Sequence, residues 1–233
     1  DGRSLWLDGT GLGARIEDIY DTPAFGNVLP LRPEGAELLR IAPHADGRPS
    51  LDLTLDVDES SSVDVPSVFD LTLVLRGGTA MQLNLLRNQL DAARQQELFA
   101  TFLSRVVGDS QFGAIQVESD DKAALVTFRA RGLSNSAWRW DDRAMKRPLD
   151  RWLGSMDFNP DRARAAWTAI PVATPAPEGR HVRMRLRLPD GGKGFRIDGE
   201  PRLDQTIAGF AFNRSVTLAD GYVTFDERID STG

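Results

Sequence analysis

The stretches LDLTLDV (residues 51–57) and FDLTLVL (residues 69–75) decide the fold of this chain. In both, apolar side chains occupy every second position, and the positions between them are mostly Asp or Thr. A period of two is typical of an antiparallel strand with one face in the core and the other in water. The two stretches therefore predict neighbouring strands that bury the same face.

The residues that follow predict a hairpin and then a helix. Gly77-Gly78 is a turn signal, so we expect the run TAMQLNL (residues 79–85) to pair with 69–75. From Gln89 to Val107, apolar residues recur at helical spacing, and this predicts one long amphipathic helix. Asn88 is the expected N-cap, and Gly108 the expected C-terminal residue.

The remaining patterns also favour strands. Asp220-Gly221 is a two-residue hairpin signal between the last two predicted strands. The full set of further strands is 3–8, 38–41, 113–118, 123–130, 181–188, 194–199, 206–218 and 222–229. The expected fold class is α+β, predominantly antiparallel β with sandwich-like sheets and the one long helix near 89–107.

Composition shifts divide the chain into four expected regions. Residues 1–50 are a terminal strand and a Pro/Gly-bearing connector, and 51–130 are a β-rich unit with one helix. Residues 131–178 are an irregular, Trp-rich segment, and 179–233 are a C-terminal antiparallel β segment that packs with the preceding unit.

Composition limits the function classes. The 233 residues carry 28 Lys and Arg against 34 Asp and Glu, a net charge of −6, which argues against a general nucleic-acid binder. No apolar run is long enough for a membrane span, and DGRSLWLDGT does not look like a signal peptide. With no cysteine and no HExxH spacing, the sequence predicts neither a thiol nucleophile nor a metal or other cofactor.

Several residues are candidates for chemistry or binding. Arg183, Arg185 and Arg187 share one face of a predicted strand and form either a cationic binding stripe or a wet sheet face paired with Asp226 and Asp230. His44 and His181 are the only possible imidazole bases. We expect each to be structural or solvent-facing, because no GxSxG motif accompanies them. The DFNPD run (157–161) lacks the glycine and glutamate of a calcium loop, and the acidic run 56–59 is expected to be a solvated turn.

The segment Leu5-Trp6-Leu7-Asp8-Gly9-Thr10 resembles the last active-site strand of transglutaminase-like (papain-like) proteins. In that family a W-x-D-x-T pattern supplies the acid of a Cys-His-Asp triad. Further similarity runs through Leu29-Pro30-Leu31 and through the closing Gly209-Phe210-Ala211-Phe212 and Leu218 to Gly221. Together these segments look like the region downstream of the transglutaminase core in large bacterial envelope proteins that begin with a β-rich domain of unknown function.

The resemblance implies a function for the chain. Asp8 would be the triad acid, with its cysteine and histidine partners upstream of Asp1, so the chain alone would be a non-catalytic C-terminal accessory region. The parent protein would be a transamidase or cysteine peptidase of the periplasm or cell envelope. The implied partners are the upstream transglutaminase-like core or another protein chain, and an envelope peptide or glycan.

Two alternatives remain open from the sequence. One is a β-sandwich module that binds envelope glycan or peptide through its tryptophans and the arginine stripe. The other is an autonomous hydrolase that uses His44 or His181. Exposure separates the first from an accessory region, because a binding module needs several aromatic side chains on one open face. The hydrolase needs a serine or carboxylate within hydrogen-bond reach of a histidine in a cleft.

Overall fold

The two stretches that open the sequence argument form neighbouring strands of one sheet. The computed structural model describes residues 26–33, 35–41, 48–141, 143–149, 164–169, 179–207 and 210–231. Strands β3 (Leu51–Asp58) and β4 (Ser67–Arg76) pair antiparallel, with Leu53 opposite Leu73. These two leucines are 1% and 0% exposed, as the alternating pattern predicts.

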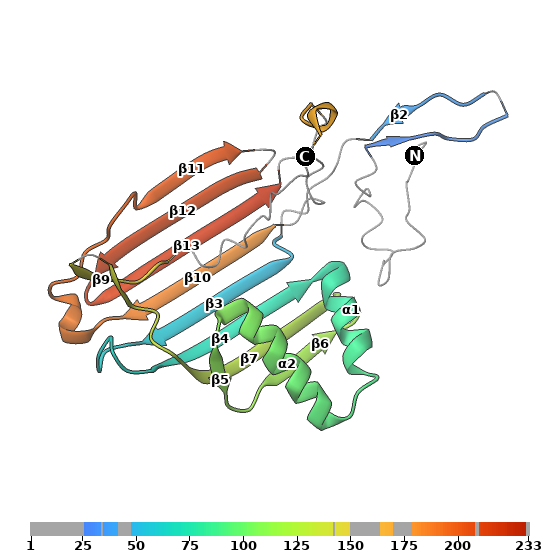
Figure 1. Ribbon diagram of the computed structural model, residues 1–233. Coiled ribbons are helices and arrows are strands. Elements are labelled where there is room, and N and C mark those ends of the chain that lie inside the picture. The colour runs from blue at the N-terminus through green and yellow to red at the C-terminus, as the bar shows by residue number, and fades with distance from the viewer. Residues whose placement is uncertain are drawn as a thin grey trace.

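Nine of the described strands, all of them after residue 50, form one sheet (Figure 1). Their order is β11-β12-β13-β10-β3-β4-β7-β5, with β6 also paired to β7. The other members are β5 (Ser110–Phe112), β6 (Gln116–Asp120), β7 (Leu125–Ser134), β10 (Arg180–Arg187), β11 (Arg202–Ile207), β12 (Phe210–Ala219) and β13 (Tyr222–Ser231). Every pairing is antiparallel except that of β10 with β3, which is parallel.

The last hairpin follows its turn signal. Asp220 and Gly221, which join β12 to β13, have φ angles of 51° and 78°. Positive φ at both central residues defines the turn whose twist matches that of paired strands, and Asp-Gly is a favoured dipeptide for it. The prediction from the dipeptide is confirmed.

The predicted strand 79–85 is wrong. Residues Gly77–Arg87 form helix α1, which contacts β4 and β7. Ala, Met, Gln, Leu and Arg dominate this segment, and all are strong helix formers. The short run of alternating residues was therefore ambiguous, and residue preference combined with packing on the sheet decided for a helix.

The predicted helix 89–107 corresponds to α2 (Ala92–Val107), which begins three residues later than predicted; with α1, the described residues contain two α-helices where the sequence indicated one. Its N-cap is Asp91, whose carboxylate accepts a hydrogen bond from the Arg94 N–H at 3.0 Å, and not Asn88, which ends α1. The last helical residue is Val107, and Gly108 follows it as the C-cap with φ of 85°, at the position where the sequence predicts it. Phe99 and Leu103 are its buried residues, while Leu98 and Phe102 pack at the flanks.

Two further strand predictions differ from the structure. Residues 194–199 form no strand, because Gly194 and Gly199 adopt φ of 86° and 102°, outside the extended region. The run 206–218 contains the end of β11 and most of β12, which pair with each other so that Ile207 lies opposite Phe210. The 113–118 strand is replaced by the two short strands β5 and β6, both on β7.

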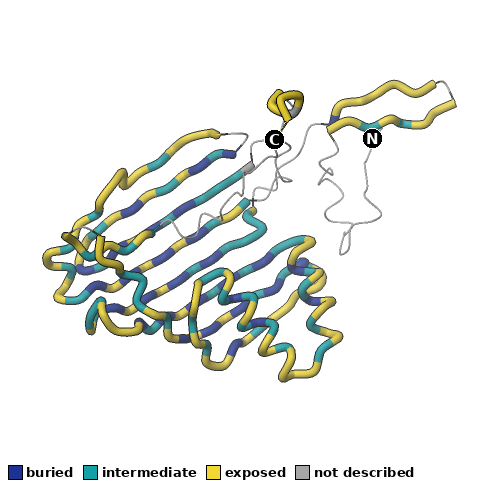
Figure 2. The backbone as a smooth tube through the Cα atoms, in the orientation of Figure 1, coloured by how far each residue is buried: buried dark blue, intermediate teal, exposed yellow. Residues whose placement is uncertain are grey.

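Only one face of the sheet is buried, and two kinds of element cover it. Helices α1 and α2 lie over β4 and β7 in Figure 1, and buried positions follow every second residue of the central strands in Figure 2. Segment 134–149 crosses the other part of that face, where Trp138 and Phe195 join the core. The remaining short elements are β1 (Asn27–Val28), β2 (Leu39–Arg40), β8 (Arg139–Asp141), β9 (Ala144–Lys146) and the 3-10 turns η3 (Ala165–Trp167) and η4 (Pro189–Gly192).

The described residues are predominantly β with two helices, which confirms the expected α+β class at that level. Nine of their strands belong to a single sheet; the other four form the separate pairs β1-β2 and β8-β9. Neither α1 nor α2 has the length and apolar character that crossing a membrane requires.

Candidate functional site

The arginine stripe lies on the open face of the sheet, and each of its guanidinium groups has a partner there. Arg183 forms an ion pair with Asp52 at 2.7 Å, and Arg187 contacts Asp58 at 3.5 Å. The Arg185 guanidinium stacks on the Tyr222 ring, 4.0 Å from its centroid. This arrangement is that of a wet sheet face whose charges neutralise one another.

The acidic partners come from a different strand than the sequence indicated. Asp226 and Asp230 of β13 bond to His181 and Arg228, at 3.0 Å and 2.7 Å. Asp52 and Asp58 belong to β3, which lies parallel to β10 on its other side. A strand in the middle of a sheet has two neighbours, and the sequence pattern identified only one of them.

The described histidine, His181, sits on this open face. Its Nε2 lies 3.0 Å from Asp226 Oδ1, and its neighbours in register are Asp52 and Arg228. Within the described ranges, no serine hydroxyl is hydrogen-bonded to the ring. A histidine–carboxylate pair without a nucleophile lacks one member of the constellation that acyl transfer requires.

Three other candidates lie outside the described residues: Asp8, His44 and the DFNPD run at 157–161. Trp6 and Trp152 lie there as well. In the part of the chain that the structure describes, no group of three or more His, Asp or Glu side chains is placed to hold a metal ion.

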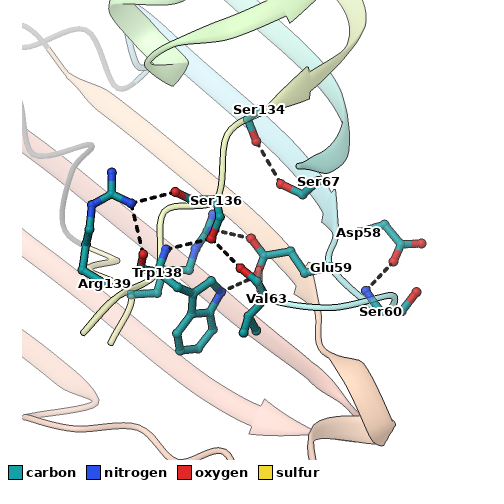
Figure 3. A network of polar contacts seen from close by, with 10 residues as sticks. Asp58, Glu59, Ser60, Val63, Ser67, Ser134, Ser136, Trp138 and Arg139 are labelled. Carbon is teal, nitrogen blue, oxygen red and sulfur yellow. Dashed lines mark hydrogen bonds and ion pairs between the residues drawn. The ribbon is translucent and has the colours of Figure 1, made fainter. Parts of the chain in front are cut away.

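Glu59 is the residue that the sequence analysis missed. It closes the acidic run that was expected to be a solvated turn, yet it is 2% exposed. Its carboxylate pairs with the Arg147 guanidinium and accepts a hydrogen bond from Trp138 Nε1 at 2.7 Å (Figure 3). The Trp138 ring packs against Phe195, with ring centroids 5.4 Å apart.

These contacts fasten segment 134–149 to the end of β3. A buried carboxylate is stable only when its charge is paired and its oxygens accept hydrogen bonds, and Arg147 and Trp138 meet both needs. Ser136 adds a hydrogen bond from its hydroxyl to the Val63 carbonyl. Glu59 and Arg147 are 88 residues apart, so no local pattern in the sequence indicates the pair.

Three ionisable groups have pKa values displaced by their partners. Hydrogen bonds from the Ser60 hydroxyl and N–H, with the Arg187 charge nearby, lower the pKa of Asp58. The Asp230 carboxylate raises the pKa of Arg228. The Asp141 carboxylate, with Asp198 beside it, raises the pKa of Lys146. All three shifts favour the charged forms, which is typical of structural ion pairs, so none of these three groups is poised for proton transfer near neutral pH.

A cavity of about 350 Å³ lies beside the Glu59 cluster. It opens between the C-terminal turn of α2 and segment 134–149, over the buried face of β3, β4 and β10. Its floor is apolar, with Leu55, Phe69 and Met184 each no more than 4% exposed. Its polar lining includes Arg105, Ser110 and Arg139. Volume and lining suit a small molecule with an apolar and a polar part.

Comparison with known proteins identifies no relative of this chain. No protein-family model matches the chain, and no match is found among curated proteins or solved structures. The arguments that follow therefore rest on the residues of this chain.

Proposed function

We propose that the chain is a non-catalytic accessory region of a transglutaminase-like envelope protein, where it acts as a scaffold or positions substrate for the catalytic core. The proposal starts from the WLDGT motif and from the absence of cysteine in the sequence. In this reading Asp8 serves a catalytic centre whose thiol and imidazole are supplied by upstream residues.

The observation that carries the proposal is the burial of the aromatic side chains. Phe69, Phe99, Phe128 and Phe225 are each no more than 2% exposed, and Trp138 is half-buried in the Glu59 cluster. Trp140 is the one described aromatic side chain that stands in solvent, 74% exposed. An open aromatic platform is the mark of a sugar-binding module, whereas nearly all of the aromatic side chains whose burial the structure describes are buried or half-buried, as a domain needs for its own stability.

The state of the charges supports the same reading. The arginine stripe is occupied by Asp52, Asp58 and the Tyr222 ring, and His181 by Asp226. A polymer binding there would first have to displace these partners. An accessory role uses the sheet as a rigid support and leaves its open face solvated.

The first test is the reading frame upstream of Asp1. We expect a cysteine and a histidine at papain-like spacing, and a frame that encodes neither would contradict the proposal. The second test is incorporation of a fluorescent amine, together with peptide cleavage, by the purified chain. No turnover is expected. Activity that disappears in His44→Ala or His181→Ala would establish the autonomous hydrolase instead.

The glycan- or peptide-binding sandwich remains the second candidate, and the exposed Trp140 ring is the observation in its favour. It requires a second β layer in addition to the nine-stranded sheet. Pull-down on envelope peptidoglycan tests it, with Trp140→Ala as the variant and Arg94→Gln, exposed on α2, as the control. Retention that depends on Trp140 would favour this candidate, and no retention would favour the accessory region. Both candidate functions imply a location in the periplasm or cell envelope.

A further inference from the structure

The cavity beside the Glu59 cluster is a gap in the layer that covers the sheet. Helix α2 ends at Val107, and segment 134–149 begins on the other side of the opening. Between them, Leu55, Val57 and Phe69 of the sheet face a space of about 350 Å³, although each is no more than 4% exposed. Volumes of this size lie at the lower end of the range for small-molecule sites.

The rim of the cavity carries two cations without ionic partners. Arg105 stands in the last turn of α2, and Arg139 begins β8. The Arg139 guanidinium donates only to the Ser136 and Trp138 carbonyls, both at 3.0 Å. Within the described residues, neither arginine forms an ion pair with a carboxylate. The planar guanidinium is the side chain best suited to hold a carboxylate.

The other polar groups at the cavity differ in charge. Arg147 is neutralised by Glu59, whereas the Asp109 carboxylate accepts a hydrogen bond only from the neutral Asn135 amide, at 3.0 Å, and adds one negative charge to the lining. The two rim arginines outnumber it, so the cavity keeps an excess of positive charge. The Ser110 hydroxyl oxygen is buried and has no hydrogen-bond partner in the described structure. A buried hydroxyl without a partner is costly, and a bound acceptor atom would remove that cost.

We propose that this cavity binds a small organic anion, a carboxylate carried on a short apolar group. The carboxylate binds at Arg105 and Arg139, and the apolar group lies on Leu55, Phe69 and Met184. Apolar contact with the floor supplies affinity, and the two guanidinium groups select the charge of the ligand. This site is independent of the accessory role, which rests on Asp8 and on the upstream residues.

Titration calorimetry of the full chain with octanoate tests the proposal. We expect saturable binding of one molecule per chain, and a loss of at least about tenfold in affinity, which corresponds to about 1.4 kcal/mol, in Arg105→Gln and in Arg139→Gln. Arg94→Gln is the matched control, because Arg94 lies on the same helix, away from the cavity, with a side chain that is 73% exposed. Its affinity should equal that of the unsubstituted chain.

Two further arms separate charge from apolar contact. Octanamide, which has the same tail without the charge, should bind at least about tenfold more weakly than octanoate. Octylamine should not bind better than octanoate, even though α2 turns its partly negative C-terminal end toward the opening.

Ala137→Trp provides a variant that needs no change in the core, because Ala137 lines the cavity from segment 134–149 and is half-buried. A bulky ring there should abolish octanoate binding while the thermal melt stays cooperative. Absence of saturable heat, equal affinity in both arginine variants and in Ala137→Trp, or preference for octylamine would each overturn the proposal.

Discussion

The two faces of the nine-stranded sheet are built from the same strands and have opposite chemistry. On β3, Leu53 and Leu55 are 1% and 4% exposed beneath the covering layer. The residues between and beside them belong to the open face, where Asp52 and Asp58 retain side-chain exposures of 18% and 48%. The covered face is dry, and the open face is solvated.

This difference indicates where the stability of the molecule resides. Burying one large apolar side chain contributes about 1.5–3 kcal/mol, whereas an exposed ion pair contributes about 0–1 kcal/mol. The apolar contacts of the covered face therefore supply most of the stability of the fold. The charged side chains of the open face pair with one another and interact with water, and they contribute little to the free energy of unfolding. Four predictions test or refine this division.

The largest effect is expected at Phe128. Its ring is 0% exposed and packs edge-on against Phe99, with centroids 5.4 Å apart, where the sheet meets α2. Phe128→Ala should lower the free energy of unfolding by about 3–5 kcal/mol, measured by urea denaturation. The control is Arg129→Ala, the next residue along β7 but on the open face, where the loss should stay below about 1 kcal/mol. Equal losses in the two variants would refute the division between the faces.

Glu59 should be the one charged residue with an effect of core size. In Glu59→Gln, the side-chain oxygen can still accept the hydrogen bond from Trp138 Nε1, but the negative charge that faces Arg147 is gone. We therefore expect the free energy of unfolding to fall by about 3 kcal/mol. The double variant Glu59→Gln with Arg147→Met should lose less than the sum of the single variants in urea denaturation, because each single substitution already removes the contact between the two residues. A single-variant loss below about 0.5 kcal/mol would mean that segment 134–149 is held by its apolar contacts alone.

Helix α2 covers the buried face, so its N-cap should contribute at an intermediate level. Asp91→Ala removes the acceptor for the Arg94 N–H, and we expect a loss of about 1 kcal/mol in the same denaturation experiment. Asn88→Ala is the matched control, since Asn88 bonds through its backbone N–H and its side chain is exposed. A larger loss in Asn88→Ala than in Asp91→Ala would place the functional cap where the sequence alone suggested it.

The smallest effect is expected at Asp58 on the open face. Hydrogen bonds from Ser60 lower its pKa in the folded chain, so its stabilising contribution is present above the unfolded value of about 3.9 and is lost as the pH falls through the lowered folded value. At pH 7, Asp58→Asn should cost less than about 0.5 kcal/mol, because the side chain is 48% exposed and solvent screens it. The difference from the unsubstituted chain should shrink as the pH falls below the folded pKa of Asp58, where the carboxyl is protonated. A difference that grew on acidification would contradict the sign of the shift.

Much of the sheet could be predicted from the sequence because strand periodicity is local. The alternation in 51–57 and 69–75 identified the buried face, and Asp220-Gly221 identified the last turn. The alternation in 181–188 also put the three arginines of the stripe on one face of a strand, but it left their role and their partners open. The pattern failed at 79–85, where seven residues fit either period and contact with β4 and β7 favoured a helix.

What the sequence by itself determined is the alternation of the central strands, the C-terminal end of α2 and the absence of a thiol from the chain. Only the tertiary structure decided that β10 lies parallel to β3, and with it that Arg183 meets Asp52 rather than Asp226. It also decided that Glu59 is buried against Arg147 and that a cavity opens above Leu55. The physical reason is distance along the chain. Periodicity and turn preference act over a few residues. The contacts of Glu59 with Arg147 and of Arg183 with Asp52 join residues more than 80 positions apart, and no local pattern in the sequence indicates such partners.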